Sequence, residues 1–177
     1  MMSYVYIYPK LREGLTDKRK LILYRVSSDE AFDRQYLEEK KRGFMFFADD
    51  LAYYSYSDTG YSAKYAKKWE FDLEGAKVFD PMKDWGGFES NSWSNIQAPV
   101  AVFEKHGFYD YENLSWESSG ELTDEDEGMT NTEDLAGYGF DNGYDITVLR
   151  DIPSNRGYGP NFTEYCVHNP NRLRKIQ

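Results

Sequence analysis

The chain has few of the side chains that build metal sites or disulfide frameworks. It contains one cysteine, Cys166, so a disulfide within its 177 residues is impossible. Cys166 lies in a strand-like apolar run, which favours a buried thiol over a nucleophile. The two histidines, His106 and His168, have no second ligand at a spacing typical of metal sites. We therefore expect neither a metal centre nor a disulfide scaffold.

Long apolar runs and glycine-rich phosphate loops are also missing. No segment approaches the length of about 20 apolar residues that a transmembrane helix needs. No glycine pattern of the Rossmann or P-loop type occurs. Together with the single cysteine, these absences predict a cytoplasmic protein with no membrane partner. They also argue against the common nucleotide-binding folds.

Basic residues are outnumbered by acidic ones. The chain has 21 Lys and Arg against 31 Asp and Glu, and its net charge is −10. Because nucleic-acid binding depends on clustered cations, direct binding of nucleic acid is not expected. An acidic surface instead favours a protein partner with a basic surface. The chain is 40% hydrophobic and 18% aromatic, which is too apolar for a disordered chain and suits one domain.

The hydrophobic pattern predicts an α+β fold, because strands and short helices do not alternate regularly. Predicted strands cover residues 4–8, 21–26, 44–48, 69–73, 77–79, 146–149 and 164–168, and residues 173–176 are expected to extend the last one. Predicted helices cover 27–43, 57–68, 99–105 and 132–137, with Asn131 or Thr132 capping the last. Residues 82–97 are expected to form a loop, and 109–131 an acidic, serine-rich segment.

Three charged side chains stand next to apolar strands and are the candidates for chemistry. Arg25 interrupts the strand 21–26, where it could form a core salt bridge or clamp a phosphate. Glu164 begins the last strand, where it could face solvent or stabilise positive charge on a sugar ring. Asp151 follows the strand 146–149, where it could cap a turn or act as a competing acid.

The order of these segments resembles that of the ADP-ribosyltransferase superfamily, in the group that includes small phage and bacterial effectors. Leu23-Tyr24-Arg25 resembles the family's first strand, and Phe46-Phe47-Ala48-Asp49-Asp50 resembles its second motif. The segment from Trp69 to Asp80 resembles the strand pair that follows. Gly143-Tyr144-Asp145-Ile146 and Glu164-Tyr165-Cys166-Val167, followed by Pro170 and Ile176, resemble the late strands. The resemblance covers most of the chain, with an acidic insertion around 84–131.

The resemblance implies a single domain over 1–177, with a split β-sandwich fold and NAD bound as a substrate. Glu164 would be the catalytic carboxylate, with Asp151 as the alternative acid. NAD would be held by Tyr24, Arg25, Ser27, Phe47, Ala48, Tyr61 and Tyr65, one of the last two tyrosines stacking on a ring.

Two positions depart from the family pattern. Ala48 stands where a Ser or Thr is usual, so the hydroxyl that often supports the glutamate is missing. Phe162 stands two residues before Glu164, where members that modify arginine carry a second acid. Arginine is therefore not the expected acceptor.

The resemblance implies an enzyme that transfers ADP-ribose to a host macromolecule, with a protein as the favoured target. One setting is a phage-encoded inhibitor of a bacterial defence system, which would act in the host cytoplasm. Two alternatives stay open. The first is an NAD glycohydrolase, in which water replaces the acceptor. The second is a non-catalytic acidic inhibitor, in which the cluster Asp124-Glu125-Asp126-Glu127 imitates nucleic-acid charge and binds a basic protein.

Overall fold

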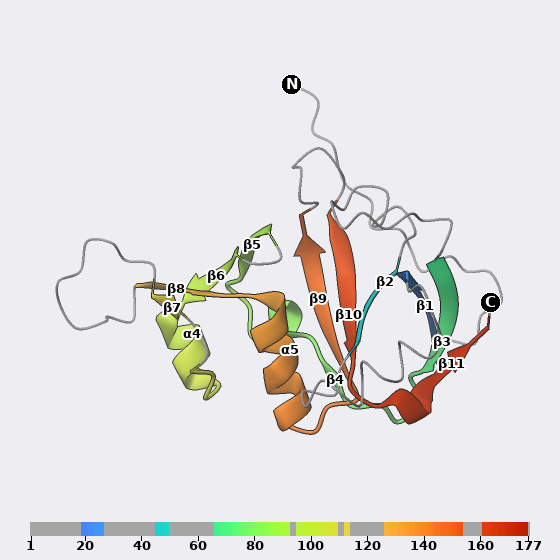
Figure 1. The fold of residues 1–177 in the computed structure, drawn as a ribbon. Coiled ribbons are helices and arrows are strands. Elements are labelled where there is room, and N and C mark those ends of the chain that lie inside the picture. The colour runs from blue at the N-terminus through green and yellow to red at the C-terminus, as the bar shows by residue number, and fades with distance from the viewer. Residues whose placement is uncertain are drawn as a thin grey trace.

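The computed structural model describes residues 19–26, 45–49, 66–92, 95–109, 112–113, 126–153 and 161–176. These residues form two β-sheets and a few short helices (Figure 1). The architecture is therefore α+β, as the hydrophobic pattern predicts.

The larger sheet has seven strands in the order β11-β3-β1-β2-β10-β9-β4. The strands are β1 (Lys20–Val26), β2 (Met45–Ala48), β3 (Ala66–Asp72), β4 (Val78–Phe79), β9 (Ile146–Ile152), β10 (Phe162–Val167) and β11 (Leu173–Lys175). Neighbouring strands are antiparallel except β4 and β9, which are parallel. Strands from the first and last parts of the chain thus become neighbours at the centre of the sheet.

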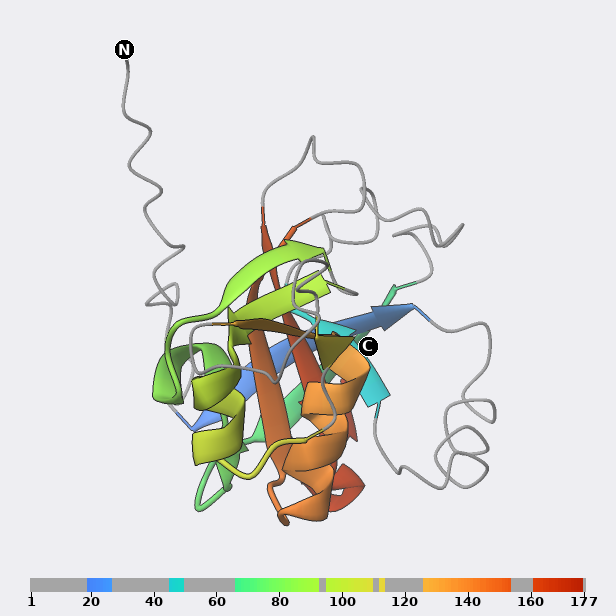
Figure 2. The ribbon, with the colours of Figure 1, turned by 90° about the vertical axis from the view of Figure 1, so that its left-hand side faces the viewer.

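The smaller sheet has four strands in the order β5-β6-β8-β7. They are β5 (Glu89–Ser92), β6 (Asn95–Pro99), β7 (Glu112–Asn113) and β8 (Glu127–Thr130). Helix α3 (Pro81–Asp84) precedes this sheet, α4 (Val100–Lys105) follows β6, and α5 (Thr132–Asp141) connects β8 to β9. When the molecule is turned, the smaller sheet lies in front of the larger one (Figure 2).

Several predicted elements are confirmed within a residue or two at their ends. Strands β1, β2 and β10 lie where the apolar runs place them, and α4 occupies nearly the predicted range 99–105. Helix α5 begins where predicted but continues to Asp141. Asn131 is its N-cap, because its side-chain oxygen accepts a hydrogen bond from the Asp134 backbone N–H at 2.8 Å.

Other predictions are wrong. Residues 66–68 belong to β3 rather than to a helix, because they pair with residues 24–26 at the end of β1. The segment 82–97, expected to be a loop, contains α3, β5 and the start of β6. Residues 173–175 do not extend β10. The chain turns after β10 through the 3₁₀ helix η2 (Pro170–Arg172), and residues 173–175 then pair with β3. The predicted strand 4–8 and helix 27–43 lie outside the described residues.

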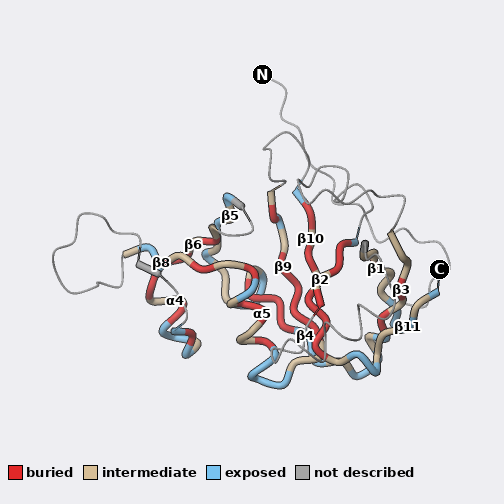
Figure 3. The backbone as a smooth tube through the Cα atoms, in the orientation of Figure 1, coloured by how far each residue is buried: buried red, intermediate tan, exposed pale blue. Residues whose placement is uncertain are grey.

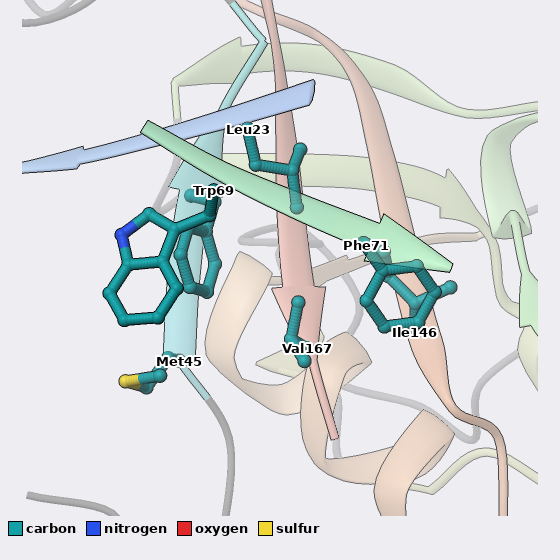
Figure 4. Close-up of a cluster of buried hydrophobic side chains, with 7 residues drawn as sticks. Leu23, Met45, Trp69, Phe71, Ile146 and Val167 are labelled. Atoms are coloured by element: carbon teal, nitrogen blue, oxygen red, sulfur yellow. The ribbon is translucent and has the colours of Figure 1, made fainter. Parts of the chain in front are cut away.

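The two faces of the larger sheet bury different clusters, because side chains alternate along each strand. The face that Figure 4 shows carries Leu23, Met45, Phe47, Trp69, Phe71, Ile146 and Val167. We call this the aromatic face. The opposite face of β9 packs with α4, α5 and β6 through Ile96, Ala98, Phe103, Phe108, Leu135, Leu149 and Ile152. Most residues of β9 and β10 are buried, because these strands lie at the junction of the two sheets (Figure 3).

Candidate functional site

One residue from each of the three motif segments lies in line with a fourth residue, from β9, across four neighbouring strands. Tyr24 on β1 lies opposite Ala48 on β2, Ala48 lies opposite Glu164 on β10, and Glu164 lies opposite Leu149 on β9. Directly paired residues on neighbouring strands share a face of the sheet. These side chains therefore form one row, which we call the Glu164 row, on the side opposite the aromatic face.

Glu164 is buried although it is a carboxylate, with 5% of its surface exposed. It is not the outward-facing strand residue that sequence alternation also allowed. On the same side of β10, two positions further on, Cys166 packs with Phe46 and with Ala136 of α5. A charged side chain at such a depth is costly unless polar contacts support it. Glu164 thus has the burial that is frequent among functional carboxylates.

The pKa of the Cys166 thiol depends on its burial and on the charges near it. Burial raises the pKa of Cys166 well above its ordinary value, the charge of Glu164 raises it further, and the charge of Arg25 lowers it. Cys166 is therefore a protonated, inert core thiol, as its apolar surroundings in the sequence predict.

Arg25 lies one position beyond the Glu164 row, where strand alternation directs it to the aromatic face. Its guanidinium donates a hydrogen bond through Nη1 to the Phe46 carbonyl at 3.0 Å. It also lies over the Phe47 ring, 5.9 Å from the ring centre. The register thus places Tyr24 beside Ala48 and directs Arg25 to the seam between β1 and β2.

Phe47 and Ala48 occupy different positions although they are adjacent in sequence. Phe47 is 2% exposed and packs edge-on against Trp69 on the aromatic face, with ring centres 6.1 Å apart. Ala48 belongs to the Glu164 row and is fully buried. Of these two predicted NAD contacts, Phe47 is a core side chain. The small Ala48 separates Tyr24 from Glu164.

Asp151 has a backbone conformation that is unusual for a residue with a side chain. Its φ is 57°, and no other described residue except glycine has a positive φ. The β9–β10 register shifts between the pair Phe162–Ile152 and the pair Glu164–Leu149. Two residues of β9, Arg150 and Asp151, therefore oppose the single residue Thr163, which defines a β-bulge. Asp151 is exposed, whereas Glu164 is buried.

A carboxylate beside the bulge was not singled out by the sequence. Asp80 is 5% exposed, and its Oδ2 accepts a hydrogen bond from Arg150 Nε at 2.7 Å. Its Oδ1 also caps α3 by accepting from the Lys83 backbone N–H. Burial raises the pKa of Tyr165, and Asp49 and Asp80 add to that effect while Arg150 opposes it. The position after an apolar dipeptide and before a proline was the only sequence signal for Asp80 as a cap.

Lys68 extends the Glu164 row and was also not singled out. It lies opposite Tyr24 in the β1–β3 pairing, whereas its neighbour Lys67 lies opposite Arg25. The sequence signal is a pair of lysines before Trp69, but only the register shows which of the two shares a face with Glu164.

Three predicted NAD contacts, Ser27, Tyr61 and Tyr65, lie outside the described residues. Within the residues that are described, no group of three or more His, Cys, Asp or Glu side chains could hold a metal ion. No helix among them has the length and apolar character needed to cross a membrane.

Comparisons with models of protein families, with curated proteins and with solved structures find no match to this chain.

Proposed function

We propose that the chain is an NAD-dependent mono-ADP-ribosyltransferase that modifies a host macromolecule, with a protein as the favoured target. The observation that supports this proposal is the Glu164 row. Tyr24, Ala48 and Glu164 come from three motif segments that are far apart in the sequence, yet they lie on the adjacent strands β1, β2 and β10. The domain would be an ADP-ribosyltransferase-like split β-sandwich, which agrees with two sheets that pack together.

In the proposed reaction, the bond between nicotinamide and the ribose C1″ atom breaks, and its electron pair leaves with nicotinamide. Positive charge develops on the ribose, and the buried carboxylate of Glu164 stabilises it. A nucleophile on the acceptor then bonds to C1″ and releases a proton. A preorganised carboxylate in a water-poor site stabilises such charge more strongly than an exposed one does.

The remaining roles belong to residues around the row. Arg25 projects from the face opposite Glu164, so in this proposal it supports the seam between β1 and β2 through the Phe46 carbonyl and does not contact the ligand at Glu164. Tyr24 and backbone groups near Ser27 hold the nicotinamide end, and Tyr61 or Tyr65 stacks on a ring. Asp151 is the alternative acid, and its bulge and exposure suit contact with an acceptor rather than with a buried ribose.

Phe162 helps to decide which acceptor residues the site could modify. It occupies the position two residues before Glu164 and is 5% exposed, so it offers no carboxylate to an arginine substrate. This supports an acceptor other than arginine.

The test uses the purified chain with NAD that carries a label on its adenylate moiety, with and without bacterial lysate. Nicotinamide release and label transfer are both followed. Transfer to a discrete lysate component supports the transferase and identifies its target. Release without transfer replaces it with the glycohydrolase. Absence of release under both conditions overturns the enzyme and leaves the acidic binding protein, which predicts salt-sensitive association with a basic partner.

A further inference from the structure

The face that bears the Glu164 row continues across β1 and β3 to the edge strand β11. Lys68 lies on this face because it pairs directly with Tyr24. Lys20 lies on it because it is four residues, an even number, before Tyr24 on the same strand. Arg174 on β11 joins them through its pairing with Glu70. Three cations thus gather on one part of a chain whose net charge is −10.

Glu70 engages two of these cations. Its Oε1 atom lies 3.1 Å from Lys20 Nζ and 2.8 Å from Arg174 Nη2. Both contacts lower the pKa of Glu70, Lys20 having the larger effect, and burial partly opposes them. The side chain of Glu70 is 18% exposed, whereas that of Arg174 is 68% exposed. Within the described part of the chain, no carboxylate forms an ion pair with the remaining cation, Lys68.

Lys68 is the cation of this group that is nearest to Glu164 along the row. Three strand spacings separate the two residues, which is about 14 Å between their backbones. Both side chains are long, and the lysine stem is flexible, so the carboxylate and the ammonium can approach more closely than this. The two side chains, together with a ribose and the diphosphate attached to it, would span this distance. Lys68 is half-buried, as expected for a lysine whose stem packs on the sheet while its ammonium stays within reach of a ligand.

We propose that Lys68 binds the diphosphate of the dinucleotide whose nicotinamide ribose lies at Glu164. This inference rests on the proposed function. In this arrangement Tyr24 lies between the two ends of the row, and Lys20 and Arg174 keep the adjacent Glu70 carboxylate from competing for Lys68. Lys68 thus provides a cation on the same face as Glu164. None of the motif residues provides one there, because Arg25 lies on the opposite face.

Lys67 provides a matched control. It is the same residue type on the same strand, and it is half-buried like Lys68, but alternation directs it to the opposite face. The test measures binding of carba-NAD, an analogue that resists cleavage, by calorimetry at two salt concentrations. Wild type is compared with Lys68→Ala, Lys68→Arg and Lys67→Ala, and thermal melting checks that each variant is folded.

We expect Lys68→Ala to weaken binding by about ten- to a hundredfold, as loss of a charge-assisted hydrogen bond does. Its affinity should also depend less on salt. Lys68→Arg should recover most of the affinity, and Lys67→Ala should behave as wild type. If wild type binds and Lys68→Ala matches it, or if Lys67→Ala loses as much affinity as Lys68→Ala, the role of Lys68 is overturned alone. If wild type does not bind carba-NAD, the proposed function itself fails.

Discussion

His168 and Thr147 form a buried polar pair beneath α5, with the imidazole Nε2 atom 2.7 Å from the Thr147 Oγ1 atom. Thr147 is fully buried and His168 is 7% exposed. Burial lowers the pKa of His168 to about 4, although the nearby Asp145 opposes this shift. The folded protein therefore keeps this histidine neutral at pH values where an exposed imidazole would take up a proton.

This pair predicts loss of stability in mild acid. The unfolded chain binds a proton at His168 below pH 6.5, whereas the folded chain binds it only near pH 4. The free energy of unfolding should therefore fall between these two values, by on the order of 3 kcal/mol in total. Denaturant unfolding at a series of pH values measures this fall. His168→Gln should remove most of the pH dependence in that window, whereas His106→Gln should largely retain it. A wild-type curve that is flat from pH 6.5 to pH 4 would contradict this prediction.

Helix α5 approaches the same pair so closely that it has no room for a methyl group. A Cβ atom at Gly139 would collide with Thr147 Oγ1 and would lie 3.1 Å from both His168 Nε2 and Phe79 Cδ1. We expect Gly139→Ala to destabilise the fold by about 1–3 kcal/mol, as overpacking does. In a Thr147→Ala background the same change should cost less, because its main obstacle is gone. Unfolding free energies of the two single variants and the double variant test this, and simple additivity would argue against the collision.

The bulge at Asp151 makes a prediction that separates backbone conformation from charge. Asparagine and aspartate tolerate a positive φ, whereas β-branched residues do not. Asp151→Asn should therefore leave the stability nearly unchanged, and Asp151→Val should reduce it by about 1–2 kcal/mol. Chemical denaturation of both variants measures the difference. Equal stabilities would mean that the left-handed conformation is not retained in solution.

The Asp151→Asn variant also distinguishes the two candidate acids. Because Asp151 is exposed and Glu164 is buried, we expect Asp151→Asn to release nicotinamide at close to the wild-type rate. The measurement is the initial rate of nicotinamide release at saturating NAD. Loss of release in Asp151→Asn, with release intact in Glu164→Gln, would assign the catalytic role to Asp151 instead.

The sequence predicts best those elements whose signal is local. The apolar runs of β1, β2 and β10 and the Asn131 cap of α5 are all visible in short windows of residues. The strands β5 and β6 were missed because they are rich in Asn, Ser and Gln and depend on pairing with each other and with β8. The predicted helix 57–68 includes residues 66–68, but their pairing with β1 depends on residues 40 or more positions away and places them in β3.

In the candidate site too, local features could be predicted from the sequence and features that depend on long-range pairing could not. The burial of Glu164 and the adjacency of the three motif strands depend on long-range pairing, which the motif order could suggest but not specify. The register decides that Tyr24 and Lys68, rather than Arg25 and Lys67, share a face with Glu164. A shift of one residue would exchange these pairs, and no local pattern distinguishes the two registers.

The most direct test of the account compares wild type with Glu164→Gln for nicotinamide release from NAD. The substitution keeps the size of the buried side chain and removes its charge, so melting of the variant should show an intact fold. The account predicts that wild type releases nicotinamide and that release in Glu164→Gln falls by about 100-fold or more, as for loss of one preorganised electrostatic group. Release by a folded Glu164→Gln variant at the wild-type rate would contradict the central claim.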